Sequence, residues 1–241
     1  MPQIYQNMSQ HYLGERGESY FSIKFGSDME FGRIFQSRYF LPYCREDWVL
    51  LDFGCADGLF LRNLPAREKI GVEVNPAARE RCTQVGMRSA DQIELHKSLI
   101  SVESHRVDVV ISNHCLEHVL APFDTLKEIL RILKPNGMFV VMVPFDDYRS
   151  KKNKTWKSRD LDNHLYTWSP MNLGNLLKEV GFAVERIDIH TRAWSPKLFW
   201  LHRVFGESIF RLSCYLLGAY KGRHEVFGIG RKPIPCSEVD E

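Results

Sequence analysis

The feature that most constrains this chain is a series of short, almost continuous apolar segments that alternate with helix-like segments. These apolar segments lie at residues 49–53, 69–74, 107–112 and 138–143, and each is bounded by Gly, Pro, Asn or Asp. Runs of this kind are typical of strands that are buried on both faces. Between the last two, LAPFDTLKEILRILKPNG has apolar residues at three- and four-residue spacings, as a helix does. The alternation predicts a doubly wound α/β fold, with a parallel sheet and helices on both faces.

An aromatic-rich segment precedes this predicted core. The first 48 residues contain ten Phe and Tyr side chains, interleaved with polar residues. Within the segment, Ser27 and Glu30 have the spacing of a capping box, and they lead into Phe31 and Phe35 on one face of a predicted helix. Two interpretations remain open. The aromatic side chains either pack the segment against the sheet or form a lid over a ligand.

The segment after the core predicts a helix, two strands and an insertion. Ser169 and Pro170 begin a helix that ends at Gly181, and residues 182–190 then alternate as a half-exposed strand does. A last strand is expected at 224–232. The intervening 33 residues, 191–223, are too many for a simple connection and predict an inserted helix that packs against another surface. Its apolar residues at helical spacing are Leu198, Leu201, Phe205, Ile209, Leu212 and Leu216, and charged residues interrupt them too often for a membrane span.

A chain of 241 residues suits one elaborated domain. We expect an N-terminal cap at 1–48, a cofactor-binding α/β core at 49–190, the helical insertion at 191–223, the last strand at 224–232 and a tail at 233–241. The net charge of +2 provides no global field that would gather nucleic acid or anionic membrane.

Cysteine usage and the N-terminus bear on metal binding and location. The six cysteines show no CxxC spacing and no pairing with histidines of the kind that binds zinc, so we expect reduced thiols and no metal site. The N-terminus has no basic start followed by an apolar run, so a cytoplasmic location is expected.

The turn after the first apolar segment, VLLDFGCADGLF, is the first candidate site. It follows a strand and precedes a helix, where open α/β sheets bind ligands, and Gly54 and Gly58 allow the backbone to approach a ligand closely. A dinucleotide-binding fingerprint that starts at Gly54 would need glycines where this chain has Ala56 and Leu59. Asp57 would also repel a pyrophosphate. The turn therefore disfavours a nicotinamide oxidoreductase and favours a cationic ligand without phosphate, such as S-adenosylmethionine.

Two further acids lie where such a ligand would need them. Glu73 follows Asp52 by 21 residues at the end of the second strand, where a carboxylate can accept hydrogen bonds from both ribose hydroxyls. Asp91 is placed to meet the exocyclic amine of adenine. It also remains open that Glu73 is a solvated residue at a strand end and that Asp91 belongs to an ordinary polar loop.

Three stretches of the chain, VLLDFGCADGLFL, IGVEVNP and VDVVISNHCLEHVLAPFDTLKEILRILKPNGMFVVMVP, resemble the successive motifs of the class I S-adenosylmethionine-dependent methyltransferases. The resemblance covers residues 49–144 tightly and LYTWSPMNLGNLLKEVGFAVERIDI more loosely. Two positions depart from the family pattern: Ala56 replaces the middle glycine of the loop, and Asn136 replaces the first glycine of the usual Pro-Gly-Gly. The resemblance implies a Rossmann-like sheet of seven strands with the last one antiparallel. With the flanking segments, we expect an N-terminal helical lid and a helical insertion before the last strand.

The resemblance also implies roles for single residues. The methionine end of the cofactor would lie against Asp52, Gly54, Cys55, Ala56 and Gly58; the ribose and adenine against Glu73, Val74 and Asp91; and the floor between cofactor and acceptor would be formed by Asn113 and His114.

Three histidines are candidate catalytic residues. The methyl group of a sulfonium is already activated, so positioning of the acceptor can supply most of the rate. His114 is the first choice for a general base, because an imidazole with a pKa of about 6.5 can accept a hydroxyl proton near neutrality. His118 and His164 are rival candidates, although His118 can instead cap the next helix and His164 can simply hydrogen-bond a loop.

The acceptor is less defined. RSKKNKTWKSR, residues 149–159, has six cations in eleven residues, which indicates either a solvated loop or a grip on a phosphate. The leading hypothesis is a methyltransferase for a small-molecule or glycan-related acceptor, such as a sugar nucleotide or a lipid-linked phosphate. Nucleic acid is a weaker hypothesis, since Trp156 alone could stack on bases. A quinone or natural-product ring as the acceptor, and a non-catalytic binding module with the same fold, are also compatible with the sequence. Residues 197–217 could form a dimer interface, a substrate wall or a shallow membrane attachment.

Overall fold

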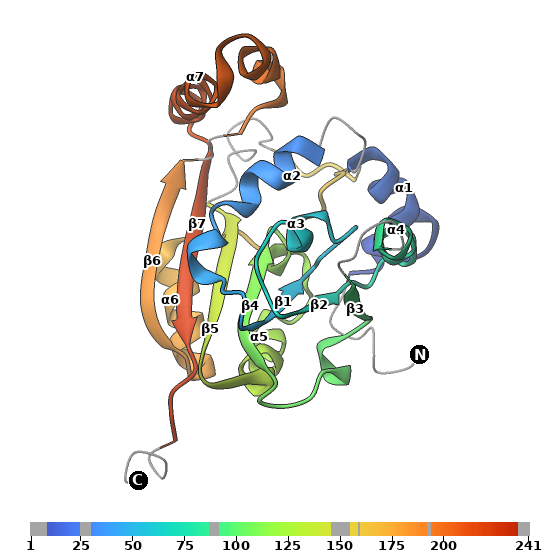
Figure 1. Ribbon diagram of the computed structural model, residues 1–241, viewed down its shortest axis with the longest axis vertical. Helices are drawn as coiled ribbons and strands as arrows, with labels where there is room; N and C mark the ends of the chain where they lie inside the picture. The colour runs from blue at the N-terminus through green and yellow to red at the C-terminus, as the bar shows by residue number, and fades with distance from the viewer. Residues whose placement is uncertain are drawn as a thin grey trace.

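The computed structural model describes residues 9–24, 30–86, 92–145, 155–158, 160–191 and 194–235. In this part of the chain seven strands form one sheet in the order β3-β2-β1-β4-β5-β7-β6 (Figure 1). The strands are β1 Val49–Phe53, β2 Glu68–Val72, β3 Ile93–His96, β4 Val107–Asn113, β5 Leu133–Pro144, β6 Ala183–Thr191 and β7 His224–Arg231. The first five pair in parallel, and β7 lies antiparallel between β5 and β6. The predicted Rossmann-like sheet of seven strands with an antiparallel last strand is confirmed.

Alternation along the central strands explains why their sequences are almost continuously apolar. Leu51, Val110 and Val141 face one side of the sheet, and their neighbours Leu50 and Val140 face the other; all are fully buried. The first side is covered by α5 (Pro122–Ile132) and α6 (Pro170–Val180). The second is covered by α3 (Leu59–Arg62) and by the segment that follows α2 (Glu30–Ser37). Burial of both faces is the arrangement that such strands require.

Helix ends follow the local sequence signals. Ser169 caps α6: its hydroxyl accepts from the Asn172 amide, the Asn172 side chain accepts from the Ser169 amide, and Gly181 ends the helix with φ at +114°. The expected capping box of Ser27 and Glu30 lies partly outside the described residues. Strand β3 was not identified in the sequence, because its four residues are only partly buried at the edge of the sheet and carry a weak apolar pattern.

The insertion between β6 and β7 contains α7 (Phe199–Tyr220), which projects beyond the sheet (Figure 1). Gly206 has non-helical dihedral angles, φ +78° and ψ −176°, so α7 consists of two helical pieces. It packs through Phe210 and Cys214 onto Phe35 of α2 and onto Trp194. Within the described part of the chain, none of the helices, α7 included, has the length and apolar character needed to cross a membrane.

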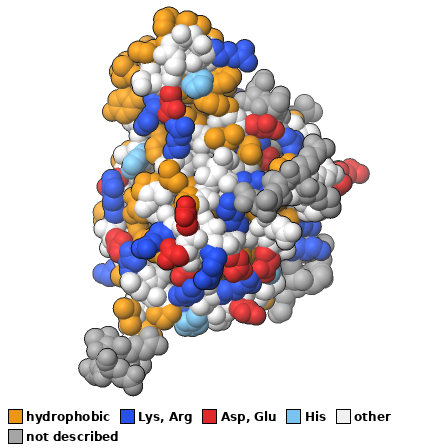
Figure 2. Space-filling view, in the orientation of Figure 1, with side chains coloured by type: hydrophobic (Ala, Val, Ile, Leu, Met, Phe, Trp, Pro, Cys, Tyr) orange, Lys and Arg blue, Asp and Glu red, His pale blue; other side chains and the backbone are white. Residues whose placement is uncertain are grey.

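Of the six apolar side chains identified in the sequence of the insertion, Leu198 packs against the cluster of Phe35, Trp194 and Phe210, Leu201 is half-buried, and four are exposed. Phe205, Ile209, Leu212 and Leu216 are each between 45% and 59% exposed, and hydrophobic side chains gather over α7 in Figure 2. The buried side of the second helical piece is formed by Phe210 and Cys214, which the predicted spacing did not include. The helix therefore packs through one face and leaves a second apolar face uncovered.

Candidate functional site

The turn between β1 and α3 is held in a conformation that glycine permits. Gly54 and Gly58 have φ angles of +86° and +71°, where side chains are disfavoured. A Cβ at Gly54 would lie 2.5 Å from the sulfur of Cys115, and one at Gly58 would lie 2.5 Å from that of Cys82. Ala56, between the two glycines, also has a positive φ of 49°. Both packing and backbone conformation thus fix the turn close to the residues that follow β4.

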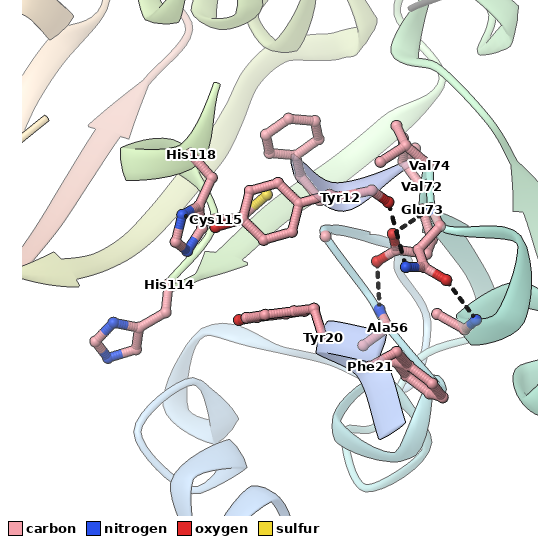
Figure 3. Close-up of a pocket in the computed structure, with 14 residues that line it drawn as sticks. Tyr12, Tyr20, Phe21, Ala56, Val72, Glu73, Val74, His114, Cys115 and His118 are labelled. Carbon is pink, nitrogen blue, oxygen red and sulfur yellow. Dashed lines mark hydrogen bonds between the residues drawn. The ribbon is translucent and has the colours of Figure 1, made fainter. Parts of the chain in front are cut away.

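Glu73, one residue beyond β2, ties this turn to the neighbouring strand. Its carboxylate accepts hydrogen bonds from the backbone amides of Ala56 (3.0 Å) and Asn75 (2.7 Å), as Figure 3 shows. Burial raises the pKa of Glu73, although these amides oppose the rise. The side chain lines a cavity. The two backbone amides therefore fix the orientation of the Glu73 carboxylate, which faces any ligand in that cavity.

The cavity lies at the carboxyl ends of β1, β2 and β4 and has a volume of about 650 Å³, including its open mouth. Its wall has three parts. The turn between β1 and α3 contributes Gly54 and Ala56, and the residues just after β2 are Glu73 and Val74. The segment after β4 contributes His114, Cys115 and His118, and the N-terminal segment contributes Tyr12, Tyr20 and Phe21. Tyr12 links two of these parts, because its backbone carbonyl accepts a hydrogen bond from Asn75 Nδ2 at 3.2 Å.

Several residues predicted to contact the cofactor do not line this cavity. Asp52 and Cys55 are buried beside it, Gly58 packs against Cys82, and Asn113 lies at the end of β4. Burial, together with the nearby Glu73 carboxylate, raises the pKa of Asp52 to about 8. Asp91 lies outside the described residues.

Asp57 was expected to repel phosphate and favour a cationic ligand, but its charge is already compensated within the protein. Its carboxylate accepts a hydrogen bond from Arg33 of α2 at 2.8 Å, and Arg81 lies 3.9 Å away. Asp57 is 3% exposed. The ion pair fastens α2 to the turn between β1 and α3. Because the charge of Asp57 is paired in this way, it adds no free negative charge to the cavity.

His114 connects two buried carboxylates. Its Nε2 lies 2.8 Å from Glu225 of β7, and its Nδ1 lies 3.4 Å from Glu117. Burial alone would lower the pKa of His114, but the carboxylates of Glu117 and Glu225 outweigh it and raise the pKa to about 9. At neutral pH this imidazole therefore carries a proton and acts as a hydrogen-bond donor.

His118 is neutral in the same wall. Its Nδ1 lies 2.6 Å from the hydroxyl of Tyr12, and that hydroxyl donates to the backbone carbonyl of Asp162. Burial lowers the pKa of His118 to about 4, although Glu117 opposes the change. The ring of His164 lies 4.8 Å from the ring of His118. The three candidate histidines are thus brought together on the side of the cavity away from Glu73 and Val74.

Sequence reasoning missed Glu117, Glu225 and the particular role of Tyr12. Both glutamates are almost fully buried. Burial would raise the pKa of Glu117, but the imidazoles of His118 and His114 outweigh it and lower the pKa to about 2. A charged residue within an apolar strand, as Glu225 is in HEVFGIG, needs a buried partner, and this signal could have been read. Nothing in the sequence distinguished Tyr12 from the other N-terminal aromatic residues.

The strand order, the turn after β1 and the carboxylate after β2 together define the fold of the class I methyltransferases. Comparison with protein families agrees: the family described as "Methyltransferase domain" matches this chain over residues 31–187, well over half of its length. The chain therefore belongs to this methyltransferase family, and S-adenosylmethionine is its cofactor. The described cavity fits that cofactor, because Glu73 faces it beside an open backbone turn.

Relatives with descriptive names extend the comparison. A protein of Mycolicibacterium smegmatis named "Probable S-adenosylmethionine-dependent methyltransferase" is 27% identical over 146 residues, which are 56% of this chain and 52% of that protein. The chain thus spans about half the length of the curated relative that it matches.

Solved structures share the fold at low sequence identity. A chain from the complex of the Haloferax volcanii Trm112 methyltransferase activator with a methyltransferase has a TM-score of 0.65 at 16% identity, covering 92% of this chain and 99% of that one. Geranyl diphosphate C-methyltransferase of Streptomyces coelicolor, crystallised with Mg²⁺, geranyl diphosphate and S-adenosylhomocysteine, has a TM-score of 0.60 at 14% identity, covering 89% and 87%. Phosphoethanolamine N-methyltransferase 2 of Haemonchus contortus, in complex with S-adenosylmethionine, has a TM-score of 0.62 at 14% identity, covering 93% and 59%.

Proposed function

We propose that this protein transfers the methyl group of S-adenosylmethionine to a small-molecule acceptor. The acceptor would be held between the turn at residues 54–58 and the part of the cavity wall that contains His114 and His118. The observation that carries this proposal is the single cavity that Glu73, His114 and His118 share. A cavity lined by side chains from three parts of the chain suits a small acceptor better than a folded macromolecule.

The cofactor would occupy the part of the cavity formed by β1 and β2. Gly54 and Ala56 would lie against its methionine end, Glu73 would accept from the ribose hydroxyls, and Val74 would contact the adenine. Asp52, Cys55 and Gly58 would support the turn from behind without touching the ligand. The predicted roles of Asn113 at the floor and of Asp91 at the adenine amine remain predictions.

The acceptor would then face His114 and His118. Nε2 of His114 faces the carboxylate of Glu225, and Nδ1 faces that of Glu117, so a protonated His114 would form part of the wall beside the acceptor and would not remove its proton. For an acceptor that must lose a proton, the neutral imidazole of His118 is the group in this wall that can accept one. His164, beside it, would support the same role.

Two features bear on the chemical class of the acceptor. The aromatic side chains of Tyr12, Tyr20 and Phe21 in the wall suit a flat ring, which supports a quinone or natural-product acceptor. A glycan-related acceptor was inferred from the cations at 149–159, of which the structure describes 155–158. The geranyl diphosphate and phosphoethanolamine methyltransferases are named for small phosphate-bearing compounds, and a phosphate-bearing acceptor is consistent with that inference. A binding module without catalysis is the alternative, and a methyl-transfer assay separates the two.

Calorimetry with purified protein tests the proposal. We expect S-adenosylmethionine and S-adenosylhomocysteine to bind, and Glu73→Gln to weaken both by about 10-fold or more, equal to about 1.4 kcal/mol, because a neutral amide is a poorer acceptor for two hydroxyl groups. Glu80→Gln, on α4 (Pro76–Gly86), is the control and should bind as the wild type does. Transfer of a labelled methyl group to members of a panel of phenols, quinols and phosphate esters then identifies the acceptor class. Absence of binding by the wild type, or an unchanged affinity in Glu73→Gln, would contradict the proposal.

A further inference from the structure

Glu117, His118 and His164 form a cluster of potential metal ligands beside the cavity. One ligand atom from each residue lies within 4.8 Å of the others. The backbone holds this arrangement in place: the carbonyl of Glu117 accepts hydrogen bonds from the amides of Leu165 (2.9 Å) and Tyr166 (3.3 Å). The loop that carries His164 is therefore fastened to the residue that provides the carboxylate. Two imidazoles and one carboxylate are a donor set that divalent transition metals bind.

The carboxylate of Glu117 is not satisfied by the protein around it. The residue is fully buried, and neither of its oxygens accepts a hydrogen bond from the described part of the chain. Its nearest nitrogen neighbours are His114 Nδ1 at 3.4 Å and His118 Nε2 at 3.7 Å. His114 is shared with a second buried carboxylate, Glu225. The imidazole of His114 thus faces two carboxylates, and a buried carboxylate whose oxygens accept no hydrogen bond from the described residues favours a bound cation.

The hydrogen bonds of Tyr12 define which nitrogen of His118 carries the proton. The hydroxyl of Tyr12 donates its one hydrogen to the carbonyl of Asp162, so its oxygen accepts from Nδ1–H of His118. A neutral imidazole then has its lone pair on Nε2, the nitrogen 3.7 Å from Glu117 Oε1. Two electron-rich atoms face each other across this distance. A cation bound between them would make the arrangement favourable.

We propose that Glu117, His118 and His164 bind a divalent first-row transition metal ion, with Zn²⁺ as the best match. Ligand atoms about 2.0 Å from a tetrahedral metal lie roughly 3.3 Å apart, so the ligand atoms, now within 4.8 Å of one another, would move closer together when the metal binds. The hydrogen bond from His118 to Tyr12 is the kind of contact that orients a metal-bound imidazole. Mg²⁺ and Ca²⁺ prefer oxygen ligands, and two histidines disfavour them.

Three protein ligands leave one tetrahedral position for water or for a ligand. Because His118 lines the cavity, this position would be next to the acceptor, and, resting on the proposed function, a hydroxyl of the acceptor bound there would have a lower pKa and would release its proton to water at the mouth of the cavity. With the metal in place, His118 acts as a ligand and no longer as a proton acceptor. The sequence expectation of no metal site rested on cysteine spacing and did not consider adjacent Glu117 and His118 with a distant His164.

The test uses tag-free, full-length protein that has been stripped with a chelator. Titration with Co²⁺, followed by its visible absorption, and competition with Zn²⁺ should give one metal ion per chain. His164→Ala should reduce the affinity by at least about 10-fold, and Glu117→Gln should do the same. His96→Ala is the matched control, because His96 Nε2 lies 2.6 Å from Glu94 in a histidine–carboxylate pair outside the cluster. This substitution should leave metal binding unchanged.

Calorimetry with S-adenosylhomocysteine on the same samples separates the outcomes. Cofactor affinity equal to that of the wild type in His164→Ala, together with lost metal binding, supports a metal site in a folded protein. Wild-type protein that binds S-adenosylhomocysteine but takes up well under one equivalent of either metal overturns the proposal and leaves the methyltransferase assignment intact. Metal binding that is unchanged in both His164→Ala and Glu117→Gln overturns it as well.

Discussion

At the scale of single residues, the two departures from the family motifs share one property. Ala56 and Asn136 stand where the family has glycine, and both have positive φ angles, +49° and +63°. The backbone is left-handed at both positions although each residue carries a side chain. Such a conformation is disfavoured for a residue with a side chain, although Asn tolerates it better than Ala does.

Ala56→Gly should therefore stabilise the protein. We expect the free energy of unfolding to rise by about 1 kcal/mol, because the strain of a left-handed alanine is removed. Asn136→Gly should give a smaller change. Urea denaturation of both variants measures the effect, and a less stable Ala56→Gly would show that the alanine is not strained.

Asp52 predicts a pH dependence of stability. Its pKa is about 8 in the folded protein and about 3.9 in an unfolded chain. Between these values the unfolded chain has released a proton that the folded protein still binds, so the free energy of unfolding should fall as pH rises from about 4 to 8. Asp52→Asn should make the profile flatter over this range. The exposed Asp47→Asn is the control and should follow the wild type; equal slopes for Asp52→Asn and the wild type would contradict the prediction.

Single residues were predictable where local sequence decides their position. Gly54 and Glu73 belong to short motifs at strand ends, so their place beside a ligand followed from the motif. Tyr12 lines the cavity from the N-terminal segment, and Glu225 of β7 contacts the cavity residue His114. Their contacts with His114 and His118 depend on how β7 and the N-terminal segment pack, and no local pattern records that.

At the scale of elements, burial decided what could be predicted. The central strands were evident because both faces are covered by helices and every position is apolar. Strand β3, with four half-buried residues, gave no comparable signal. The spacing of apolar residues indicated a helix at α7 but could not reveal the break at Gly206, because a glycine within a helical pattern is compatible with an unbroken helix.

The exposed apolar face of α7 predicts attachment to an anionic membrane surface. Phe205 and Leu212 are 59% and 55% exposed, and the same helix carries Arg203 and Arg211; exposed apolar side chains together with basic ones are typical of helices that lie in the membrane interface. We expect the wild type to sediment with vesicles that contain anionic lipid. The double variant Phe205→Asp, Leu212→Asp should remain in the supernatant with unchanged cofactor affinity.

Ile100→Asp is the matched control for this experiment, since Ile100 is 62% exposed and lies away from α7. It should sediment as the wild type does. The membrane prediction is contradicted if the wild-type protein stays in the supernatant. If light scattering then shows that the wild type is a dimer and the double variant a monomer, the exposed face binds a second copy of the chain and not lipid.

At the scale of the whole molecule, the site is assembled from five distant parts of the chain. Tyr12, Glu73, His118, His164 and Glu225 come from the N-terminal segment, two strand ends, a loop and the last strand. The resemblance to a known family indicated the first wall of the cavity, because its motifs lie within 100 consecutive residues. The second wall depends on segments outside those motifs, and for this reason the cofactor was predictable and the acceptor was not.

The connection of the insertion to the sheet has a consequence for the evolution of the chain. Thr191 and His224 are paired across β6 and β7, and the insertion leaves the sheet at one and returns at the other. Everything between them can therefore change in length or identity without altering the register of either strand. A descendant that exchanged α7 would need to cover Phe35 of α2 again, but it would inherit the strands and the cavity unchanged. A lineage could therefore change the surface carried at this edge of the sheet and leave the walls of the cavity as they are.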